Sequence, residues 1–132
     1  ETDAGARHFL VLNVPNVALA PIVADGGPAT AAIALALSAA FNNRLANALD
    51  DLTITAPDID IIHFDAFTFI SIVVANPAVF GLNNVVDTCL SFFVIEDVIC
   101  EQPSHYLFWD AIHPTRAGHR VLARQILNTL TE

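Results

Sequence analysis

The sequence predicts an α/β fold with a parallel sheet, and three observations support this. Residues 7–15 form a short apolar run of β-formers that stops at Pro15, which is typical of a strand buried on both faces. A helical repeat of large apolar residues begins after Pro28, and a second apolar run follows at residues 59–64. Strand, helix and strand in this order predict a βαβ unit with a right-handed crossover. Two strands are too few for a complete parallel sheet, which is normally covered on both faces.

Length, composition and charge limit the kinds of protein to consider. The chain has 132 residues, enough for one domain at most. A hydrophobic fraction of 55% with only 14% charged residues excludes a disordered chain and a coiled coil. The formal net charge is −9, and all five cationic residues are Arg. So few cations give no basic stripe that could neutralise phosphates, so we expect no nucleic-acid partner.

The sequence predicts no membrane span, and any secretion signal is expected to have been removed or to lie upstream. The most apolar stretch, residues 66–86, is interrupted by Asn, Pro and Gly, which predicts a buried segment followed by a loop. No basic segment followed by an apolar one stands at the start. Because the chain contains no Met, we expect it to be a piece of a longer polypeptide.

The first half of the chain has one strong helical signal. Residues 15–27 hold two Pro and two Gly and are predicted to be a loop, while Pro28 suits the first position of a helix. The helix is predicted to run to the break at Ala56-Pro57. Its predicted inner face consists of apolar residues at helical spacing: Ile33, Leu37, Phe41, Leu45, Leu49 and Leu52.

The second half alternates between apolar and irregular segments. Residues 59–64 are predicted to be a strand, 66–75 a short buried helix and 76–103 a long irregular stretch. The last helix is predicted over residues 116–130, with Thr115 as its N-cap. Three residues of that helix are predicted to face inward: Leu122, Ile126 and Leu130.

The two cysteines, Cys89 and Cys100, close a loop of about a dozen residues. In a reducing compartment they would be two core thiols, whereas in a secreted protein they would pair. We favour a disulfide because the cysteines flank a segment without regular pairing. The spacing shows no Cys-x-x-Cys or His-x-x-x-His signature, so we predict neither a metal site nor a cofactor.

Asp110 and His113 are the residues best placed for catalysis. Asp110 stands three positions before His113, and in a turn the two side chains can meet. A carboxylate that accepts from one imidazole nitrogen fixes the tautomer and leaves the other nitrogen free to take a proton from a hydroxyl nucleophile. Pro114 keeps His113 out of helical geometry, so the imidazole should project from a loop just before the last helix.

Spacing alone is weak evidence, because Asp60 and His63 have the same spacing. That pair lies in a predicted strand, where residues three apart point to opposite faces, so it cannot form a dyad. No serine lies between glycines in a nucleophile elbow, and no Gly-rich phosphate loop or dinucleotide fingerprint is present. The residues therefore give a base and its orienting acid without a nucleophile.

Residues 106–115, Tyr-Leu-Phe-Trp-Asp-Ala-Ile-His-Pro-Thr, with Gly118-His119 after them, resemble the last conserved block of the GDSL-type lipases and esterases, the SGNH hydrolases. The resemblance covers nearly the whole chain and favours a secreted branch that includes phospholipases and autotransporter esterases. Further matches follow in the family's order: Asn13-Val14-Pro15 with Pro21, Phe41-Asn42, Phe64-Asp65, Asn76-Pro77 with Phe80-Gly81, and Cys89.

The resemblance implies a three-layer α/β/α fold in which a serine near the N-terminus attacks an ester. His113 would be the general base and Asp110 its partner, while the family's serine and oxyanion-hole blocks have no counterpart here. We therefore expect residues 1–132 to be a single partial domain, the C-terminal half of an esterase or lipase for carboxylic or lipid esters, inactive alone. The alternative is a non-catalytic binding or assembly module derived from this fold.

The resemblance also implies a substrate-binding region and partners. The loop after the first strand, with Val14 and Pro15, would border the acyl pocket, or it is simply a Pro-rich connection. Trp109 would line the site or anchor its loop in the core. Exposed apolar faces of a half-fold should drive association with the N-terminal half or with a second copy. We expect a secreted, cell-surface or periplasmic location.

Overall fold

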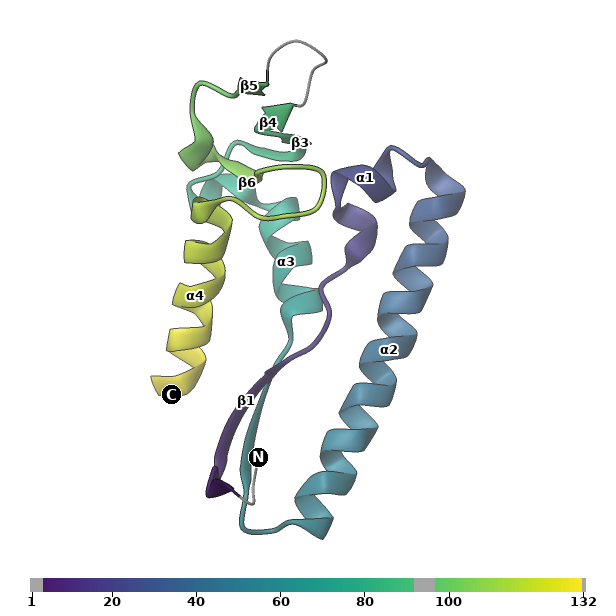
Figure 1. Ribbon diagram of the computed structural model, residues 1–132, viewed down its shortest axis with the longest axis vertical. Helices are drawn as coiled ribbons and strands as arrows, with labels where there is room; N and C mark the ends of the chain where they lie inside the picture. Colours follow the sequence, from purple (N-terminus) through teal and green to yellow (C-terminus); the bar gives the residue numbers. More distant parts are fainter. Residues whose placement is uncertain (1–3, 92–96, 132) are drawn as a thin grey trace.

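A computed structural model describes residues 4–91 and 97–131. Strand β1 (His8–Leu12) pairs in parallel with β2 (Asp60–Phe64), so that His8 lies opposite Asp60 and Leu12 opposite Phe64. Helix α2 (Pro28–Thr55) lies between these strands in the sequence and stands beside them in space (Figure 1). The predicted βαβ order and parallel pairing are therefore confirmed, but the expectation that the first strand is buried on both faces is wrong, since every residue of β1 is exposed or half-buried.

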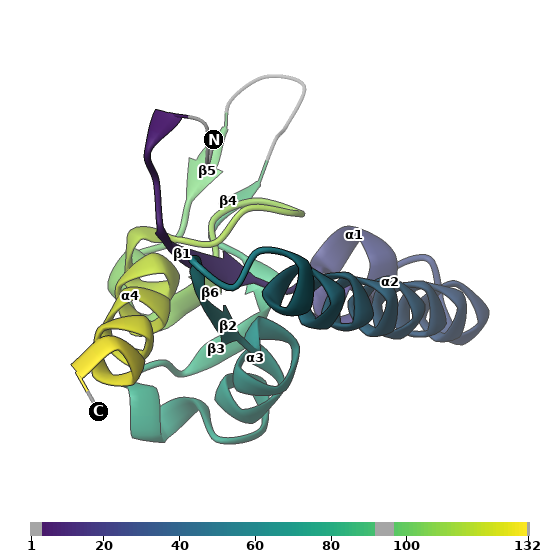
Figure 2. The ribbon, with the colours of Figure 1, turned by 90° about the horizontal axis from the view of Figure 1, so that it is seen from below.

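Helix α2 is much longer than β1, which precedes it, and β2, which follows it. Its 28 residues span about 42 Å, whereas each five-residue strand spans about 17 Å. Seen from below, α2 extends away to one side of α3 and α4 (Figure 2). The predicted inward position of four residues is wrong, because their side chains are exposed: Ile33 63%, Leu37 65%, Phe41 53% and Leu52 41%. Two short strands are too small to cover the apolar stripe, and Ser38 is the buried residue of this helix.

Residues 15–27 contain two short helices, so the prediction of a plain loop is wrong. A 3₁₀ turn covers Val17–Leu19, and α1 covers Pro21–Ala24. The Asn16 side chain caps the first of them by accepting from the Ala18 N–H at 3.1 Å. Four-residue helices are too short to show an apolar period in the sequence, which explains the missed prediction.

Helix α3 (Ala66–Ala75) has the predicted bounds and begins at a capping carboxylate. Asp65 Oδ1 accepts from the Thr68 N–H at 3.1 Å and from Asn13 Nδ2 at 2.8 Å. Burial acts to raise the pKa of Asp65, but the hydrogen bonds from Thr68 and Asn13 outweigh it and lower that pKa. The buried Asn13 amide also accepts from the Phe67 N–H, so it ties the end of β1 to the start of α3.

The core lies between α3 and the C-terminal elements. Phe69 makes edge-to-face contacts with Phe64 and Phe80 at centroid distances of 5.9 and 5.7 Å. The buried cluster consists of Phe64, Ala66, Phe69, Val73, Leu82, Val85, Leu107, Phe108 and Val121. Its members come from β2, α3, β3, β6, α4 and the loop before β3, so this half of the molecule holds the packed interior.

The prediction that residues 76–103 are irregular is wrong for residues 76–91 and 97–103, and residues 92–96 lie outside the described part of the chain. Strand β3 (Asn84–Thr88) pairs in parallel with β6 (Tyr106–Phe108), and β4 (Leu90–Ser91) pairs antiparallel with β5 (Val98–Ile99). Two 3₁₀ turns, Pro77–Phe80 and Pro103–His105, precede β3 and β6. The predicted parallel sheet is thus divided into two separate pairs among the described residues. Strands of two or three residues show no alternation by which a sequence could reveal them.

Helix α4 (Arg116–Thr131) confirms the last predicted helix and its N-cap. Thr115 Oγ1 accepts from the Gly118 N–H at 3.0 Å. Leu122 and Ile126 pack against the core as predicted, but Leu130 does not, since it is 48% exposed near the end of the helix. None of the described helices is both long and apolar enough to cross a membrane.

The structure joins Cys89 to Cys100, so the predicted disulfide is confirmed, although the segment between them contains the β4–β5 pairing and is not irregular throughout. The disulfide closes a loop that contains β4 and β5. Removing the disulfide increases the conformational entropy of the unfolded chain and thereby favours unfolding. The double variant Cys89→Ser/Cys100→Ser should therefore lose about 3 kcal/mol of unfolding free energy. Urea unfolding of both proteins measures this loss, and equal midpoints would contradict it.

Candidate active site

The turn that carries Asp110 and His113 is pinned at both ends. The Trp109 N–H donates to the His113 carbonyl at 2.8 Å, and the Thr115 N–H donates to the Leu107 carbonyl at 2.8 Å. Phe108 and Pro114 form an isolated bridge across the turn. The turn therefore leaves β6 and returns beside it before α4 begins.

Inside this turn, Asp110 holds both the backbone and the imidazole of His113. Its Oδ1 accepts from the backbone N–H groups of Ile112 at 2.9 Å and His113 at 2.7 Å. Its Oδ2 lies 2.8 Å from His113 Nδ1, and Oδ1 lies 3.0 Å from the same nitrogen. One carboxylate thus fixes the shape of the turn and the orientation of the ring.

Electrostatics set the protonation of the pair. The backbone N–H of His113, helped by that of Ile112 and by the imidazole, lowers the pKa of Asp110 to about 2. An ionised carboxylate only accepts hydrogen bonds, so His113 Nδ1 carries a proton. The lone pair of a neutral ring is then on Nε2.

The His113 side chain is 72% exposed, whereas that of Asp110 is 23% exposed. Within the described residues no group hydrogen-bonds to His113 Nε2. The imidazole is therefore held by one nitrogen and open at the other, which is the arrangement that a general base requires.

The loop after β1 reaches this turn, because the Ile22 N–H in α1 donates to the Ala111 carbonyl at 3.1 Å. The Asn42 side chain of α2 hydrogen-bonds to the same loop through both backbone groups of Val14. Asn42 Oδ1 accepts from the Val14 N–H at 2.9 Å, and Asn42 Nδ2 donates to the Val14 carbonyl at 2.7 Å. Neither contact was predicted from the sequence, although Asn42 belongs to the Phe41-Asn42 match.

The three residues predicted to bind substrate are not brought together. Val14 lines an open hollow of about 500 Å³ with apolar residues of α2, among them Leu37 and Phe41. Trp109 is half-buried and lines a different hollow of about 280 Å³. Pro15 is exposed and lines neither hollow.

The other candidates behave as structural residues. Asp60 lies 3.4 Å from His8 Nδ1, and within the described residues it makes no contact with His63, as predicted. Ser38 and Ser71 donate to carbonyls of their own helices, so their hydroxyls are already used. Within residues 4–91 and 97–131, no serine hydrogen-bonds to His113. The same residues contain no group of three His, Cys, Asp or Glu side chains that could hold a metal ion.

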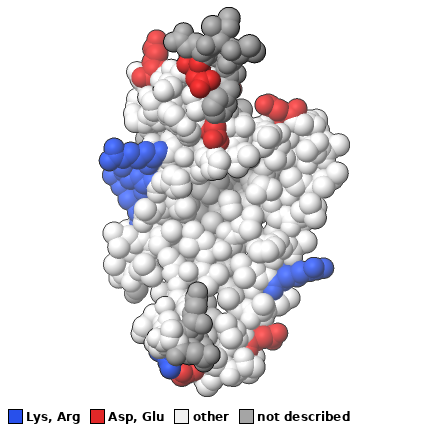
Figure 3. Space-filling model, in the orientation of Figure 1, with Lys and Arg blue, Asp and Glu red and all other residues white. Residues whose placement is uncertain are grey.

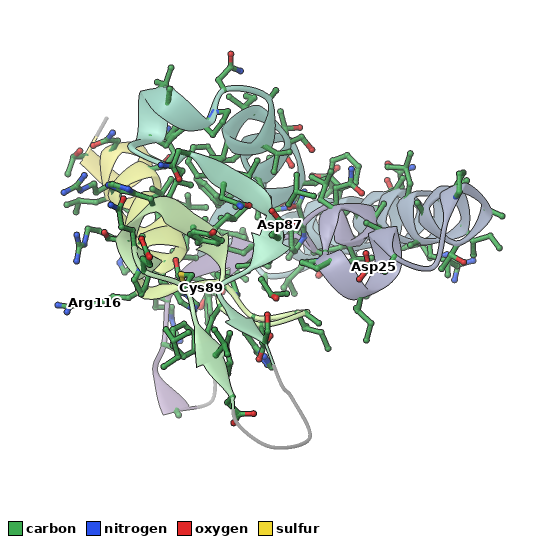
Figure 4. All side chains as sticks on the ribbon, turned by 90° about the horizontal axis from the view of Figure 1, so that it is seen from above. Asp25, Asp87, Cys89 and Arg116 are labelled. Atoms are coloured by element: carbon green, nitrogen blue, oxygen red, sulfur yellow. A yellow bond between two sulfur atoms is a disulfide. The ribbon has the colours of Figure 1, made fainter. Side chains whose placement is uncertain are left out.

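The disulfide lies next to the strand that leads into the turn. The Cys89 N–H donates to the Phe108 carbonyl at 3.0 Å, and the Leu90 N–H donates to the Trp109 carbonyl at 2.6 Å. Figure 4 shows Cys89 among the strands inside the molecule. The bridge thus braces the backbone just before Asp110.

Thr115 has a second contact that sequence reasoning missed. Besides capping α4, its Oγ1 donates to the Tyr106 carbonyl at 2.6 Å. The buried Thr115 side chain therefore holds the end of the turn against the start of β6. The capping pattern before Gly118 gave a signal for the first contact, but nothing in the sequence indicated the second.

Comparisons with known proteins agree with this geometry. The model of the GDSL-like lipase/acylhydrolase family matches residues 2–126. Two GDSL esterase/lipases of Arabidopsis thaliana are 29% and 27% identical to the chain, covering 94% and 97% of it and 37% of each relative. The anther-specific proline-rich protein APG of the same plant is 29% identical over 70% of the chain and 20% of its own length. The chain thus spans well under half the length of these relatives.

This family has the α/β fold of SGNH hydrolases, with which the parallel pairs β1–β2 and β3–β6 are consistent. The last conserved block that the resemblance rested on is the segment that holds Asp110 and His113 in the turn before α4. With the family model covering nearly all of the sequence, we conclude that the chain belongs to the GDSL-like lipase/acylhydrolase family.

Proposed function

We propose that this chain supplies the general base and its orienting acid to a serine ester hydrolase that acts on carboxylic or lipid esters. The observation that carries the proposal is the hydrogen-bonded Asp110–His113 pair with an open Nε2. The nucleophilic serine would come from another segment of the same hydrolase, its N-terminal half. The chain alone would then be inactive.

In the proposed reaction, Nε2 takes the proton of the serine hydroxyl while the serine oxygen forms a bond to the ester carbonyl carbon. The tetrahedral intermediate then breaks its bond to the alcohol oxygen, which receives the proton from Nε2. Water repeats the sequence on the acyl-enzyme and releases the acid. Asp110 keeps its negative charge throughout and stabilises the imidazolium that forms in each half.

The exposed apolar side chains of α2 support the proposal that this chain binds a second polypeptide segment. Ile33, Leu37 and Phe41 form an apolar surface on a helix that two short strands leave uncovered. Burying such a surface against the serine-bearing half would remove it from water. Self-association of two copies would cover the same surface, and it belongs to the alternative proposal of a non-catalytic assembly module.

The disulfide supports an oxidising location, because such bonds persist in secreted and periplasmic proteins. We accordingly propose a secreted, cell-surface or periplasmic hydrolase. We also propose that the hydrolase belongs to the family branch that includes phospholipases and autotransporter esterases.

The test begins with the reading frame upstream of the codon for Glu1. A frame encoding Gly-Asp-Ser and later Gly-x-Asn-Asp supports the hydrolase, whereas an unrelated frame favours the assembly module. The joined protein should hydrolyse a short-chain nitrophenyl ester, and its serine variant should not. Serine-dependent turnover by residues 1–132 alone would refute the claim that the nucleophile lies elsewhere.

The pKa of Asp110 gives a pH-dependent prediction for stability. A carboxyl whose pKa falls on folding stabilises the native state above its unfolded pKa, and this contribution disappears as the pH falls through the folded value. With a native pKa of about 2, Asp110 should contribute about 2 kcal/mol above pH ~4 and progressively less towards pH ~2. Urea unfolding of the chain and of Asp110→Asn should show a gap that narrows below pH ~4. A gap that widens on acidification would contradict the prediction.

A further inference from the structure

Most of the positive charge of this acidic chain is gathered on one helix. Three of its five cationic residues, Arg116, Arg120 and Arg124, follow one another at intervals of four residues along α4. This spacing places them on one side of the helix, where like charges repel each other. The expectation that the few cations form no basic stripe is therefore wrong for α4. The sequence of α4 contains no Asp or Glu to offset them. Figure 3 shows a blue basic cluster over this side of the molecule.

Two of these arginines line a hollow. Arg116 and Arg120 share a space of about 280 Å³ with the indole of Trp109 and with Ser104. Pro103, Thr115 and Ala117 complete the lining, and Arg124 is not part of it. Two arginines, a tryptophan and a serine therefore border the same hollow.

The side chains of Arg116 and Arg120 are exposed at the edge of this hollow. Within residues 4–91 and 97–131, no carboxylate oxygen lies within 4.0 Å of the guanidinium of Arg116 or Arg120. Figure 4 shows the Arg116 guanidinium extending outward from the start of α4. The hollow also lies at the N-terminal end of a sixteen-residue helix, where the helix dipole adds to the positive potential.

We propose that this hollow binds a small ligand through a phosphate or carboxylate group, with a flat or apolar part of the ligand lying against Trp109. The planar guanidinium donates two parallel hydrogen bonds, which suit an oxyanion. The indole offers a large apolar surface at the same place. A space of this size fits a small molecule. Binding here does not depend on ester hydrolysis, since His113 does not line the hollow.

Trp109 is the one Trp of the chain, so its fluorescence reports on this hollow directly. The chain is titrated with phenyl phosphate, benzoate, inorganic phosphate and neutral phenol at constant ionic strength. We expect a saturable change with phenyl phosphate or benzoate, and the better of the two identifies the preferred oxyanion. Inorganic phosphate should bind more weakly than phenyl phosphate, because it lacks the ring.

Three variants separate the hollow from the charge of the helix. Arg116→Gln and Arg120→Gln should each raise the Kd about tenfold, because each removes charge-assisted hydrogen bonds to the ligand. Arg124→Gln removes the same charge from the same helix outside the lining, so its Kd should stay within about twofold of the unmodified chain. Circular dichroism confirms that each variant is folded.

Several results would overturn the proposal. Equal weakening by Arg124→Gln and Arg116→Gln would mean that the helix attracts anions without a defined site. If phenol binds as tightly as phenyl phosphate, the arginines do not contribute to binding. If inorganic phosphate binds more tightly than phenyl phosphate, Trp109 does not contribute. The absence of a saturable fluorescence change with every anion would refute the site itself.

Discussion

In the proposed serine-bearing hydrolase, Asp110→Asn is expected to lower kcat/KM by about 10⁴-fold without unfolding the turn. The amide oxygen of Asn can still accept from the N–H groups of Ile112 and His113. The amide nitrogen then faces His113 Nδ1 and donates to it, so the ring proton moves to Nε2. An imidazole in that tautomer has no lone pair for the serine proton. Hydrolysis of a nitrophenyl ester measures the loss.

The same spacing elsewhere in the chain gives a matched control. Asp60→Asn changes the first residue of the other Asp-x-x-His sequence, whose carboxylate lies 3.4 Å from the exposed His8 and away from the turn. Its kcat/KM should remain unchanged, whereas His113→Ala should lose at least as much activity as Asp110→Asn. Full activity of Asp110→Asn, or equal losses in the two Asn variants, would refute the assigned role of Asp110.

Phe69→Ala should have the largest effect on stability, a loss of about 3–5 kcal/mol of unfolding free energy. Phe69 is 9% exposed and contacts the rings of Phe64 and Phe80, so truncation removes two aromatic contacts and leaves a cavity. Since domains are stable by only about 5–15 kcal/mol, such a loss should leave the variant close to unfolding. Urea unfolding by circular dichroism measures it.

Phe41→Ala is the control for Phe69→Ala, because it deletes the same atoms from a side chain that is 53% exposed. A dilute sample should lose no more than about 1 kcal/mol, since little apolar area returns to water. A loss as large as that of Phe69→Ala would show that α2 is covered in solution, for example by a second copy.

Elements with their own local signals were predictable from the sequence. Helix α3 has the predicted bounds because Asp65 caps its start and Asn76-Pro77 ends it. Helix α4 was found through Thr115 and its apolar spacing. Strands β1 and β2 stand out as apolar runs between breaking residues.

The missed features depend on partners distant in the sequence or on very short segments. Strand β3 is recognisable only through its pairing with β6, about 20 positions further on, because neither strand shows a clear alternation. The apolar spacing of α2 indicated a helix correctly, but periodicity cannot reveal how much of that face is covered.

The candidate site divides in the same way. The Asp110–His113 contact was predictable because both residues belong to one turn. The contact of Ile22 with Ala111 joins segments about 90 positions apart and left no mark in the sequence. Trp109 and Val14 were both predicted near the substrate, but they line separate hollows. Trp109 lies in the turn after β6, whereas Val14 lies in the loop after β1, which Asn42 of α2 holds.

The three-residue spacing between Asp110 and His113 has a consequence for how a working enzyme assembles. Closing so short a loop takes well under a microsecond, and its entropic cost is small compared with that of pairing distant strands. The imidazole can therefore be aligned before the long-range contacts of the sheet form. In the proposed hydrolase, mutations that disturb distant packing should therefore leave the contact between Asp110 and His113 in place.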